Sequence, residues 1–530
     1  MILSFVRNFF YFFDENIKKI IVYNQKKFII NNESKNLVLV DYTENKQCFL
    51  PYSYVLNALC LKHNAKLITF KVDIALSFIK NLAHHFFFIF SIFPFSIYKS
   101  FGTKQNIFYT FNKKNKNISK RIFVNIVKKI KTKNDILNIQ IKNIKIGDLI
   151  YDHYLKKYRK YTVNYNDKKF LKFLYKSILI FIYWDNFFKD NNVKAISVTH
   201  AVYLTGIPTR LAIFRKIPVY HMNLSYLFKL DKINDRPYLD FKYSKIYFKE
   251  LSFSKRKKLI KKAKQRISLR LNKSLVGIDM NYSTKSAWEK NKNSVLIKSN
   301  NIKILIATHC FFDSPHGYGN MIFPDFYEWL NFLGKFSYRT DYDWYLKSHP
   351  DFLPENVGVL KYFLNKYPNL RLLDPKTSHH QIINDGINFV LTCHGTIGFE
   401  YAMMNIPVIN ASLNNPHINF GFNIHARSIK NYIKILSNLN KLKIKINRKE
   451  IYQYYAMRFL NSKIDYIFSD TQKIFRKYNF EEEKLPTMVF NDFIKHYSNS
   501  KHKKIINVIN NFINSDDYML RKKHFLKSKL

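Results

Sequence analysis

Short apolar runs alternate with segments of helical spacing through the second half of the chain. Each run is brief and bounded by polar residues, which predicts a β-strand, and the longer segments between them predict helices. We expect strands over 303–307, 343–347, 370–373, 388–392 and 407–409, with helices near 325–336, 356–366, 379–385 and 397–404. This alternation predicts a doubly wound parallel sheet, an α/β fold whose ligands bind beyond the carboxyl ends of the strands.

The first half opens with a strand, a helix and a strand, at 37–40, 51–62 and 65–70. Such a βαβ start predicts a second Rossmann-like sheet. Further strands are expected at 107–109, 195–198 and 218–220, and a long apolar helix at 167–188. A Lys/Arg-rich amphipathic helix is expected at 254–270, with Leu259, Ile260, Ala263, Ile267 and Leu271 on one face. We therefore expect an N-terminal domain over 1–285, a linker over 286–301, a C-terminal domain over 302–448 and a helical basic tail over 449–530.

The most apolar stretch, FFFIFSIFPFSIY at 86–98, has two interpretations. It is shorter than the roughly 18 residues needed to span a bilayer, and Pro94 interrupts it. It is either a buried helix or pair of core strands, or a hydrophobic foot on the inner membrane face, helped by nearby lysines. The apolar start of the chain is interrupted by Arg7 and lacks a cleavage site, so we expect no signal peptide. The four cysteines form no CxxC pair, which fits a cytoplasmic, reducing location.

The charge is strongly positive, with 88 Lys+Arg against 37 Asp+Glu and a net charge of +51. This excess favours anionic partners such as lipid headgroups or phosphorylated substrates. An A/T-rich coding sequence also explains it, because Lys, Asn, Ile, Phe and Tyr are all overused together. No nucleic-acid-binding motif accompanies the charge, so we expect no nucleic-acid partner.

Candidate ligand-binding residues cluster at or directly after the ends of three of the strands predicted in the second half. They are His309, Asp313 and His316 after the first strand, Lys347, His349 and Pro350 after the second, and His394, Gly395, Thr396, Gly398 and Glu400 after the fourth. The carboxyl ends of parallel strands meet at one sheet edge, so these segments should converge. The third group predicts a phosphate cradle, because a Gly-Thr turn leads into a helix start with free N–H groups.

Each of these groups also has a structural interpretation. A glutamate at position 400, in a first helical turn, offsets the helix dipole. A His-Pro pair such as His349-Pro350 also occurs in ordinary turns, whereas its functional role would be to present an imidazole beside the Lys347 ammonium to phosphates. The cluster of His309, Asp313 and His316 is also compatible with a divalent metal ion.

Two of these segments, YLKSHPD (345–351) and HGTIGFEYAMMNIPVIN (394–410), resemble motifs of capsular polysaccharide biosynthesis proteins. These are GT-B-type glycosyltransferases related to capsule Kdo transferases and, more distantly, to bacterial polysialyltransferases. The resemblance covers 302–412 and extends loosely to 197–220; Ser348 stands where the family often has proline. It implies two Rossmann-like domains facing across a cleft, with the acceptor held by the N-terminal domain. It also implies that His349 binds donor phosphate and that Thr396 and Glu400 complete the nucleotide pocket.

An inverting transfer needs a general base near the acceptor hydroxyl. The candidates are Asp148 and Asp152 in GDLIYD and His200 at the end of a predicted strand, while Arg210 is placed to meet an anionic acceptor. Asp148 is equally suited to cap a helix beginning at Leu149, and His200 to be a satisfied buried histidine.

We therefore predict a metal-independent glycosyltransferase with no cofactor, which uses a CMP- or UDP-sugar and a glycan or glycolipid acceptor of a surface polysaccharide. A polyol-phosphate transferase or a nucleotide-sugar epimerase would use the same architecture. A non-catalytic membrane-surface scaffold of polysaccharide export is the alternative from another class.

Overall fold

The computed structural model describes residues 11–28, 34–232, 238–272, 279, 287–289, 293–349, 355–442, 444–462, 464–478 and 485–526. The chain forms two compact units, each assembled from separate stretches of sequence. Unit 1 comprises 1–150, 165–237 and 463–530, and unit 2 comprises 151–164 and 238–462. These limits differ from the expected domain ranges: the helix expected at 254–270 belongs to unit 2, and most of the C-terminal tail belongs to unit 1.

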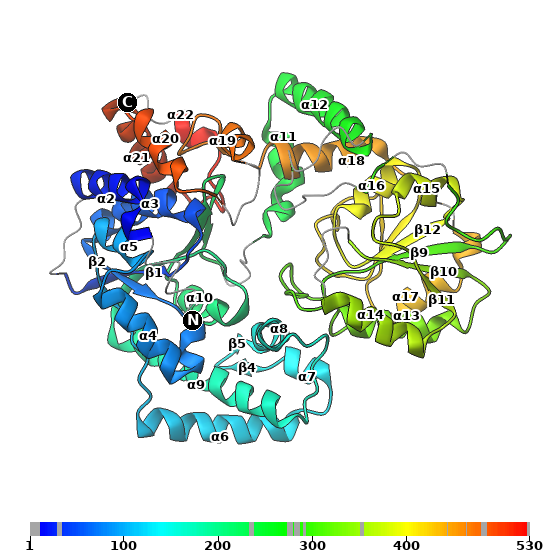
Figure 1. Cartoon of the computed structure of the whole chain (residues 1–530), viewed down its shortest axis with the longest axis horizontal. Helices are drawn as coiled ribbons and strands as arrows, with labels where there is room; N and C mark the ends of the chain where they lie inside the picture. Colours follow the sequence, from blue (N-terminus) through cyan, green and yellow to red (C-terminus); the bar gives the residue numbers. More distant parts are fainter. Residues whose placement is uncertain are drawn as a thin grey trace. The chain divides into compact units, whose positions relative to one another are not determined.

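Unit 1 is built on a six-stranded sheet in the order β3-β2-β1-β6-β7-β8; β1 and β2 are labelled in Figure 1. Neighbouring strands are parallel except for the β7–β8 pair, which is antiparallel. The strands are β1 Asn36–Asp41, β2 Ala65–Phe70, β3 Thr103–Asn106, β6 Asn192–Val198, β7 Val219–Asn223 and β8 Tyr226–Leu230. In their order along this sheet they run 3-2-1-4-5-6, the arrangement of a Rossmann fold.

The strand expected at 107–109 is wrong, because β3 ends at Asn106. The backbone of Tyr109 is instead bound by a side chain: Asn81 donates from Nδ2 to its carbonyl (2.9 Å) and accepts from its N–H (3.2 Å). An asparagine amide thus takes the place of a strand partner and ends the ladder.

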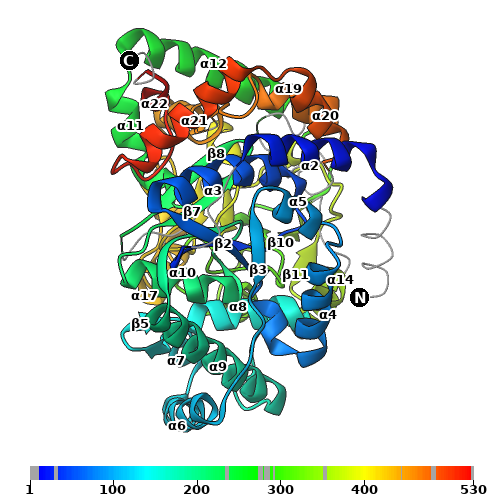
Figure 2. The same cartoon turned by 90° about the vertical axis from the view of Figure 1, so that its left-hand side faces the viewer.

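Helices cover both faces of this sheet. One layer contains α2 Glu15–Lys27, α3 Phe49–His63 and α5 Phe95–Ser100, which pack on the sheet with tail helices in one apolar cluster (Figure 2). The other includes α9 Lys168–Asp190, which packs against α6 Lys113–Lys129 and α10 Gly206–Phe214. As predicted, α9 is long and apolar, and Asp167 caps it by accepting from the Lys169 N–H.

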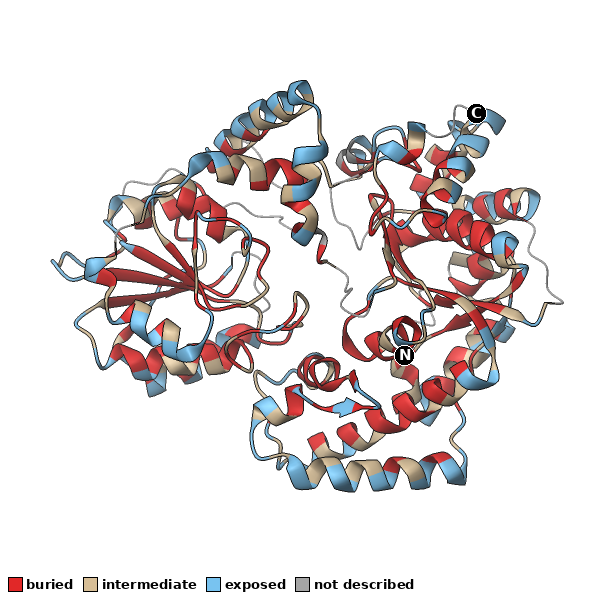
Figure 3. Cartoon of the chain, turned by 180° about the vertical axis from the view of Figure 1, so that it is seen from behind, coloured by how far each residue is buried: buried red, intermediate tan, exposed pale blue. Residues whose placement is uncertain are grey.

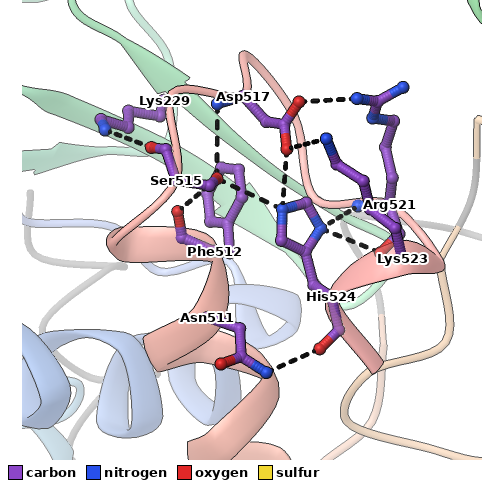
Figure 4. A network of polar contacts seen from close by, with 8 residues as sticks. All are labelled: Lys229, Asn511, Phe512, Ser515, Asp517, Arg521, Lys523 and His524. Carbon is purple, nitrogen blue, oxygen red and sulfur yellow. Dashed lines mark hydrogen bonds and ion pairs between the residues drawn. The ribbon is translucent and has the colours of Figure 1, made fainter. Parts of the chain in front are cut away.

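The helical, basic tail is confirmed, and its residues from 463 onward belong to unit 1. The helices of that part are α19 Thr471–Lys477, α20 Met488–Lys495, α21 Asn499–Ile513 and α22 Lys523–Leu526. After α21 the chain pairs with β8, where Lys229 N–H donates to Tyr518 O and Leu520 N–H donates to Leu227 O, both at 2.8 Å. Asp517, Ser515 and His524 then join into a polar network beside this pairing (Figure 4).

Unit 2 contains a six-stranded, fully parallel sheet in the order β11-β10-β9-β12-β13-β14. Its strands are β9 Lys303–Ala307, β10 Asp343–Lys347, β11 Leu370–Leu372, β12 Phe389–Thr392, β13 Val408–Asn410 and β14 Ile424–His425. The predicted doubly wound α/β fold is therefore confirmed, and each of the five expected strands agrees with the structure to within one residue at either end. The strand order is again 3-2-1-4-5-6.

The two faces of the unit 2 sheet carry different helices. Ile304 and Ile306 of β9 pack on the face with α13 Phe326–Ser337, α14 Glu355–Lys366 and α17 Ile429–Leu436. Leu305 and Ala307 point to the face covered by α15 His379–Asn384 and α16 Ile397–Met403. The alternation follows the two-residue period of a strand. The four central strands, β10, β9, β12 and β13, are buried on both faces (Figure 3). From β9 the following strands are added on one side of the sheet, and from β12 they are added on the other side. The junction between β9 and β12 is therefore the topological switch point.

The basic helix expected at 254–270 is α12, Phe253–Leu271, and its apolar face is buried as predicted. Ala263, Ile267 and Leu271 pack in a cluster with Phe399 of α16 and with α18 Arg448–Tyr455. Helix α16 begins shortly after the end of β12. Because α12 packs against α16, the last turn of α12 lies at the carboxyl edge of the unit 2 sheet.

The apolar stretch 86–98 forms the end of helix α4 Phe78–Ile89 and most of helix α5. Helix α5 is buried, as the core interpretation predicts, whereas one face of α4 is exposed. Within the described residues, no helix combines the length and the hydropathy that a membrane crossing requires.

Candidate functional site

At the switch point of the unit 2 sheet, His309 links the loops that follow β9 and β12. Its Nε2 accepts a hydrogen bond from the Cys393 backbone N–H (3.2 Å) and lies 3.1 Å from Thr392 Oγ1. Burial, and then the charges of His394 and His349, lower the pKa of His309 well below its usual value. His309 is therefore a neutral imidazole that fixes the two loops against each other.

His394 lies in an aromatic surround at the same edge. Its ring centre is 4.6 Å from that of His309, 5.2 Å from Tyr318 and 5.4 Å from Phe326. Burial lowers the pKa of His394 to about 4, although the Asp313 carboxylate raises it. The structure thus brings three predicted residues, His309, Asp313 and His394, into one neighbourhood.

Lys347, the last residue of β10, is a buried cation at this edge, with 3% exposure. Its Nζ donates to the Pro375 carbonyl (2.9 Å), and burial lowers its pKa to about 8, although the carboxylates of Asp374 and Glu400 raise it. An ammonium with this pKa is mostly protonated at neutral pH. One hydrogen bond leaves donor capacity for an anionic ligand.

Glu400 pairs with a residue that the sequence analysis did not select. Arg270, at the end of α12, donates from Nε to Glu400 Oε1 (2.6 Å), and both side chains are largely buried. Arg270 is 130 residues away in the sequence and lies outside every motif, so no sequence signal indicates it. This pair means that Glu400 contributes to a mixed-charge cluster with Arg270 and Lys347.

His379, the first residue of α15, is a second addition to this edge. Its Nδ1 lies 2.8 Å from the Tyr401 hydroxyl. Burial lowers its pKa, and so do the positive charges of Lys347, His349 and Arg270. The sequence signal for His379 is its position shortly after the third predicted strand, 370–373.

His349 is exposed beyond the end of β10, and its charge acts on both His309 and His379. The residues named after β10 and β12 therefore meet at one edge, with the loop of β9 between them as the strand order requires. Pro350, the remaining predicted residue of this loop, lies outside the described residues.

The glycines of the HGTIGFE segment have distinct local roles. Gly395 has a φ of +115°, a conformation that favours glycine, and its Cα faces open space, because the nearest atom to an added Cβ is His309 Cε1 at 3.9 Å. At Gly398 an added Cβ would lie 2.3 Å from the His417 ring, so glycine permits α16 to pack there. Thr396 is the N-cap of α16, and its hydroxyl makes no capping hydrogen bond in the described structure.

The alternative interpretation of His309, Asp313 and His316 as metal ligands is not supported, because His316 is paired elsewhere. His316 Nδ1 lies 2.6 Å from Asp152 Oδ1, and its backbone N–H donates to the other oxygen of that carboxylate (3.1 Å). Within the described residues, no three His, Cys, Asp or Glu side chains are grouped so that they could hold a metal ion. Asp152 and His316 thus act as a buried pair that connects the segment 151–164 to the body of unit 2.

Asp148 is held in an ion pair in unit 1. Its two carboxylate oxygens accept from Arg210 Nη1 (2.6 Å) and Nη2 (2.7 Å), and Nη1 also donates to Lys145 O (2.6 Å). Asp148 lies within the first turn of α8 Gly147–Tyr158 and does not cap a helix beginning at Leu149. This two-point pairing explains both Asp148 and Arg210 structurally.

The switch point of the unit 1 sheet lies between β1 and β6, and it carries a buried carboxylate. Asp41, the last residue of β1, accepts from Thr199 Oγ1 (2.9 Å) just beyond β6. Burial raises the pKa of Asp41 to about 7, against the lowering effect of the Thr199 hydrogen bond and of Lys71. His200 is the next residue after Thr199, is exposed and contacts Tyr203. The strand-end rule applied to LVLVD would have selected Asp41.

No family model matches the sequence, and a comparison with curated proteins gives no match. Among solved structures, the Thermosulfurimonas dismutans KpsC β-Kdo 2,7 transferase is 13% identical with a TM-score of 0.32, covering 52% of this chain and 80% of that chain. The Neisseria meningitidis UDP-GlcNAc 2-epimerase bound to UDP-GlcNAc is 11% identical with a TM-score of 0.22, covering 87% and 100%. A Rickettsia africae glycosyltransferase is 10% identical with a TM-score of 0.23, covering 88% and 100%. The fold class of this chain rests on the strand orders of its two sheets.

Proposed function

We propose that this chain is a glycosyltransferase that moves a sugar from a nucleotide donor onto a capsular or other surface polysaccharide or its precursor. The observation that carries this proposal is the charge cluster at the carboxyl edge of the unit 2 sheet. Lys347, Arg270 and His349 supply hydrogen-bond donors to a nucleotide phosphate, and Glu400 offers an acceptor to ribose hydroxyls. The resemblance of the segments at 345–351 and 394–410 to capsule glycosyltransferase motifs supports the same assignment.

The reaction needs the donor phosphate to leave with its negative charge stabilised. Lys347 is suited to this role, because its ammonium is desolvated and has a pKa of about 8, and an approaching phosphate would strengthen its protonation. In this proposal the neutral His309 and His394 shape the pocket rather than carry charge. Transfer is metal-independent, with Lys347 and Arg270 neutralising the departing phosphate.

The acceptor side is assigned to Asp41 in place of the sequence candidates. A carboxylate with a pKa of about 7 is well matched to remove a proton from a sugar hydroxyl at neutral pH. The acceptor oxygen then attacks the anomeric carbon, the bond to the donor phosphate breaks, and the configuration inverts. Asp148 is committed to Arg210 and Asp152 to His316, which favours Asp41 over both. In this proposal His200, the residue after Thr199, orients the acceptor.

The proposal is tested by incubating the protein with CMP-, UDP-, GDP- and CDP-activated donors and surface-glycan acceptors, followed by product analysis. Transfer from one donor class, reduced by His349→Ala, is the expected result. The variant His496→Ala, which changes an exposed histidine of unit 1, is the matched control and should keep full activity. Conversion of a free UDP-sugar without acceptor would instead identify an epimerase, and transfer from CDP-glycerol a polyol-phosphate transferase.

A further inference from the structure

Helix α4 of unit 1 exposes an apolar face to solvent. Its residues are Phe78 (72% exposed), Ile79 (66%), Leu82 (52%), Phe86 (46%) and Ile89 (55%), with Phe90 (61%) just after the helix. At 3.6 residues per turn, these six positions fall within an arc of about 120°. They therefore form one continuous stripe, called here the α4 face. A contiguous exposed apolar patch of this kind often marks a surface that interacts with a protein, a ligand or a membrane.

The inner side of α4 is more polar than its outer side. The buried positions are Asn81, His84 and Phe88. Asn81 binds the backbone of Tyr109, and His84 Nδ1 lies 3.3 Å from Asn106 Nδ2. A surface helix of a globular protein normally has the reverse arrangement, with its apolar stripe facing the core. Two of the three buried positions of α4 are thus polar, and its apolar stripe is left exposed among the described residues.

Lysines lie at both ends of α4. Lys176 Nζ donates to Leu76 O (2.6 Å), two residues before the helix begins. Lys99 Nζ donates to Ile89 O (3.2 Å) and to Ser91 Oγ (2.9 Å), at the end of the helix. Lys80 is exposed on the helix itself. Positive charge therefore lies at both ends of α4 and, at Lys80, on the helix itself.

A cavity of about 760 Å³ opens on the flank of α4 and adds to this charge. His85 and Phe88 of α4 line it, together with Lys35, Lys66 and Lys104. Asp190 is the acidic residue among its lining side chains. Three lysines and one aspartate give the cavity a positive balance that suits the phosphate of a lipid headgroup.

We propose that the α4 face docks on the surface of an anionic phospholipid bilayer, with the helix lying in the headgroup layer. The apolar stripe enters the boundary of the acyl chains, and the lysines contact headgroup phosphates. An anionic bilayer fits both features, since it offers an apolar layer beneath a negatively charged one. The net charge of +51 further favours such a surface.

Docking of this kind would place the membrane close to Asp41. The His84 ring, on the inner side of α4, lies 4.5 Å from the ring of Tyr42, which follows Asp41 in the chain. A lipid-linked acceptor would thus be held near the part of unit 1 that contains the proposed base. The docking itself does not depend on the proposed transfer, and it is measured without any sugar substrate.

The test is co-sedimentation of the full chain with vesicles of phosphatidylethanolamine containing about 30% phosphatidylglycerol. Compared with the wild type, Phe78→Ser/Ile79→Ser should bind at least about tenfold more weakly, because two exposed apolar side chains no longer enter the bilayer. The matched control is Ile246→Ser/Phe253→Ser, which removes the same residue types at 57% and 75% exposure in unit 2. That control should bind like the wild type.

A second variant tests the charge. Lys35→Glu/Lys104→Glu, at two exposed lysines of the cavity, should weaken binding to anionic vesicles about tenfold and leave binding to phosphatidylcholine vesicles unchanged. Wild-type protein that stays in the supernatant, or equal binding by the α4 variant and its control, would overturn the proposal. The proposal would also be overturned if the wild type formed an oligomer without vesicles and Phe78→Ser/Ile79→Ser did not. The α4 face would then be a contact between copies of the chain.

Discussion

The two sheets share one strand order but differ in the chemistry at their switch points. In unit 2 the edge between β9 and β12 gathers neutral histidines beside Lys347 and Arg270. In unit 1 the equivalent edge between β1 and β6 presents Asp41, a buried carboxylate with a raised pKa. In our proposal, the same strand order therefore supports an anion-binding edge in one unit and a proton-accepting edge in the other. The difference comes from residues at or near the strand ends, with Arg270 added from helix α12 in unit 2.

Changing Asp41 should have the largest effect on this contrast. Asp41→Asn keeps the size of the side chain and the contact with Thr199 but cannot accept a proton. We expect the rate of transfer to fall about 100- to 10,000-fold, the range typical of a lost general base, while nucleotide affinity stays unchanged. Steady-state kinetics and calorimetric titration of nucleotide measure the two quantities. Wild-type turnover in Asp41→Asn would show that a group other than Asp41 is the general base.

The pH dependence separates the two edges within one protein. Transfer should rise with pH through about 7 as Asp41 loses its proton, since the carboxylate is the active form. It should fall above about pH 8 as Lys347 loses its proton, since the ammonium is the form that binds phosphate. The measurement is the pH profile of kcat/KM for the donor. A profile that keeps its high-pH decline in Lys347→Met would assign that limb to another group.

A smaller effect is expected on stability at Gly398. An added Cβ there meets the His417 ring at 2.3 Å, so Gly398→Ala should lower the free energy of unfolding by about 1–3 kcal/mol, as overpacking does. Gly358, in α14, has nothing within 4 Å of an added Cβ. Gly358→Ala should therefore raise stability by up to about 1 kcal/mol, because alanine favours a helix. Urea unfolding of both variants checks this, and equal shifts would contradict the packing account.

Local patterns predicted the elements well. The strands of unit 2 follow from short apolar runs, α9 from a long apolar segment, and α12 from its helical spacing. The predicted strand at 107–109 failed because the partner of that backbone is the Asn81 side chain, which no local pattern reveals. The domain limits also differ from those expected, because the tail returns to β8 through contacts that are distant in sequence, such as Leu520 with Leu227.

Residues of the candidate site were predictable only where a charged or polar side chain ends a strand or follows directly after it. Lys347, His349 and His394 were selected in this way, and the structure places them at one edge. Arg270 was missed because it comes from a helix 130 residues from its partner Glu400. Asp41 obeys the strand-end rule, but it follows a short apolar run, LVLV, and belongs to no motif that indicates chemistry. Asp148 and Asp152 were selected by a motif, and tertiary partners occupy both of them.

The central claim is that a nucleotide phosphate binds at the carboxyl edge of the unit 2 sheet. Calorimetric titration of the best-binding nucleotide into Lys347→Met and Lys303→Met tests it most directly. Lys303 is the matched control, because it is also buried on a strand but lies at the first residue of β9, where its Nζ contacts Asp385 O (3.3 Å). The account predicts about 10- to 100-fold weaker binding for Lys347→Met, the loss expected for a charge-assisted hydrogen bond, and wild-type affinity for Lys303→Met. Equal affinity in both folded variants would contradict it.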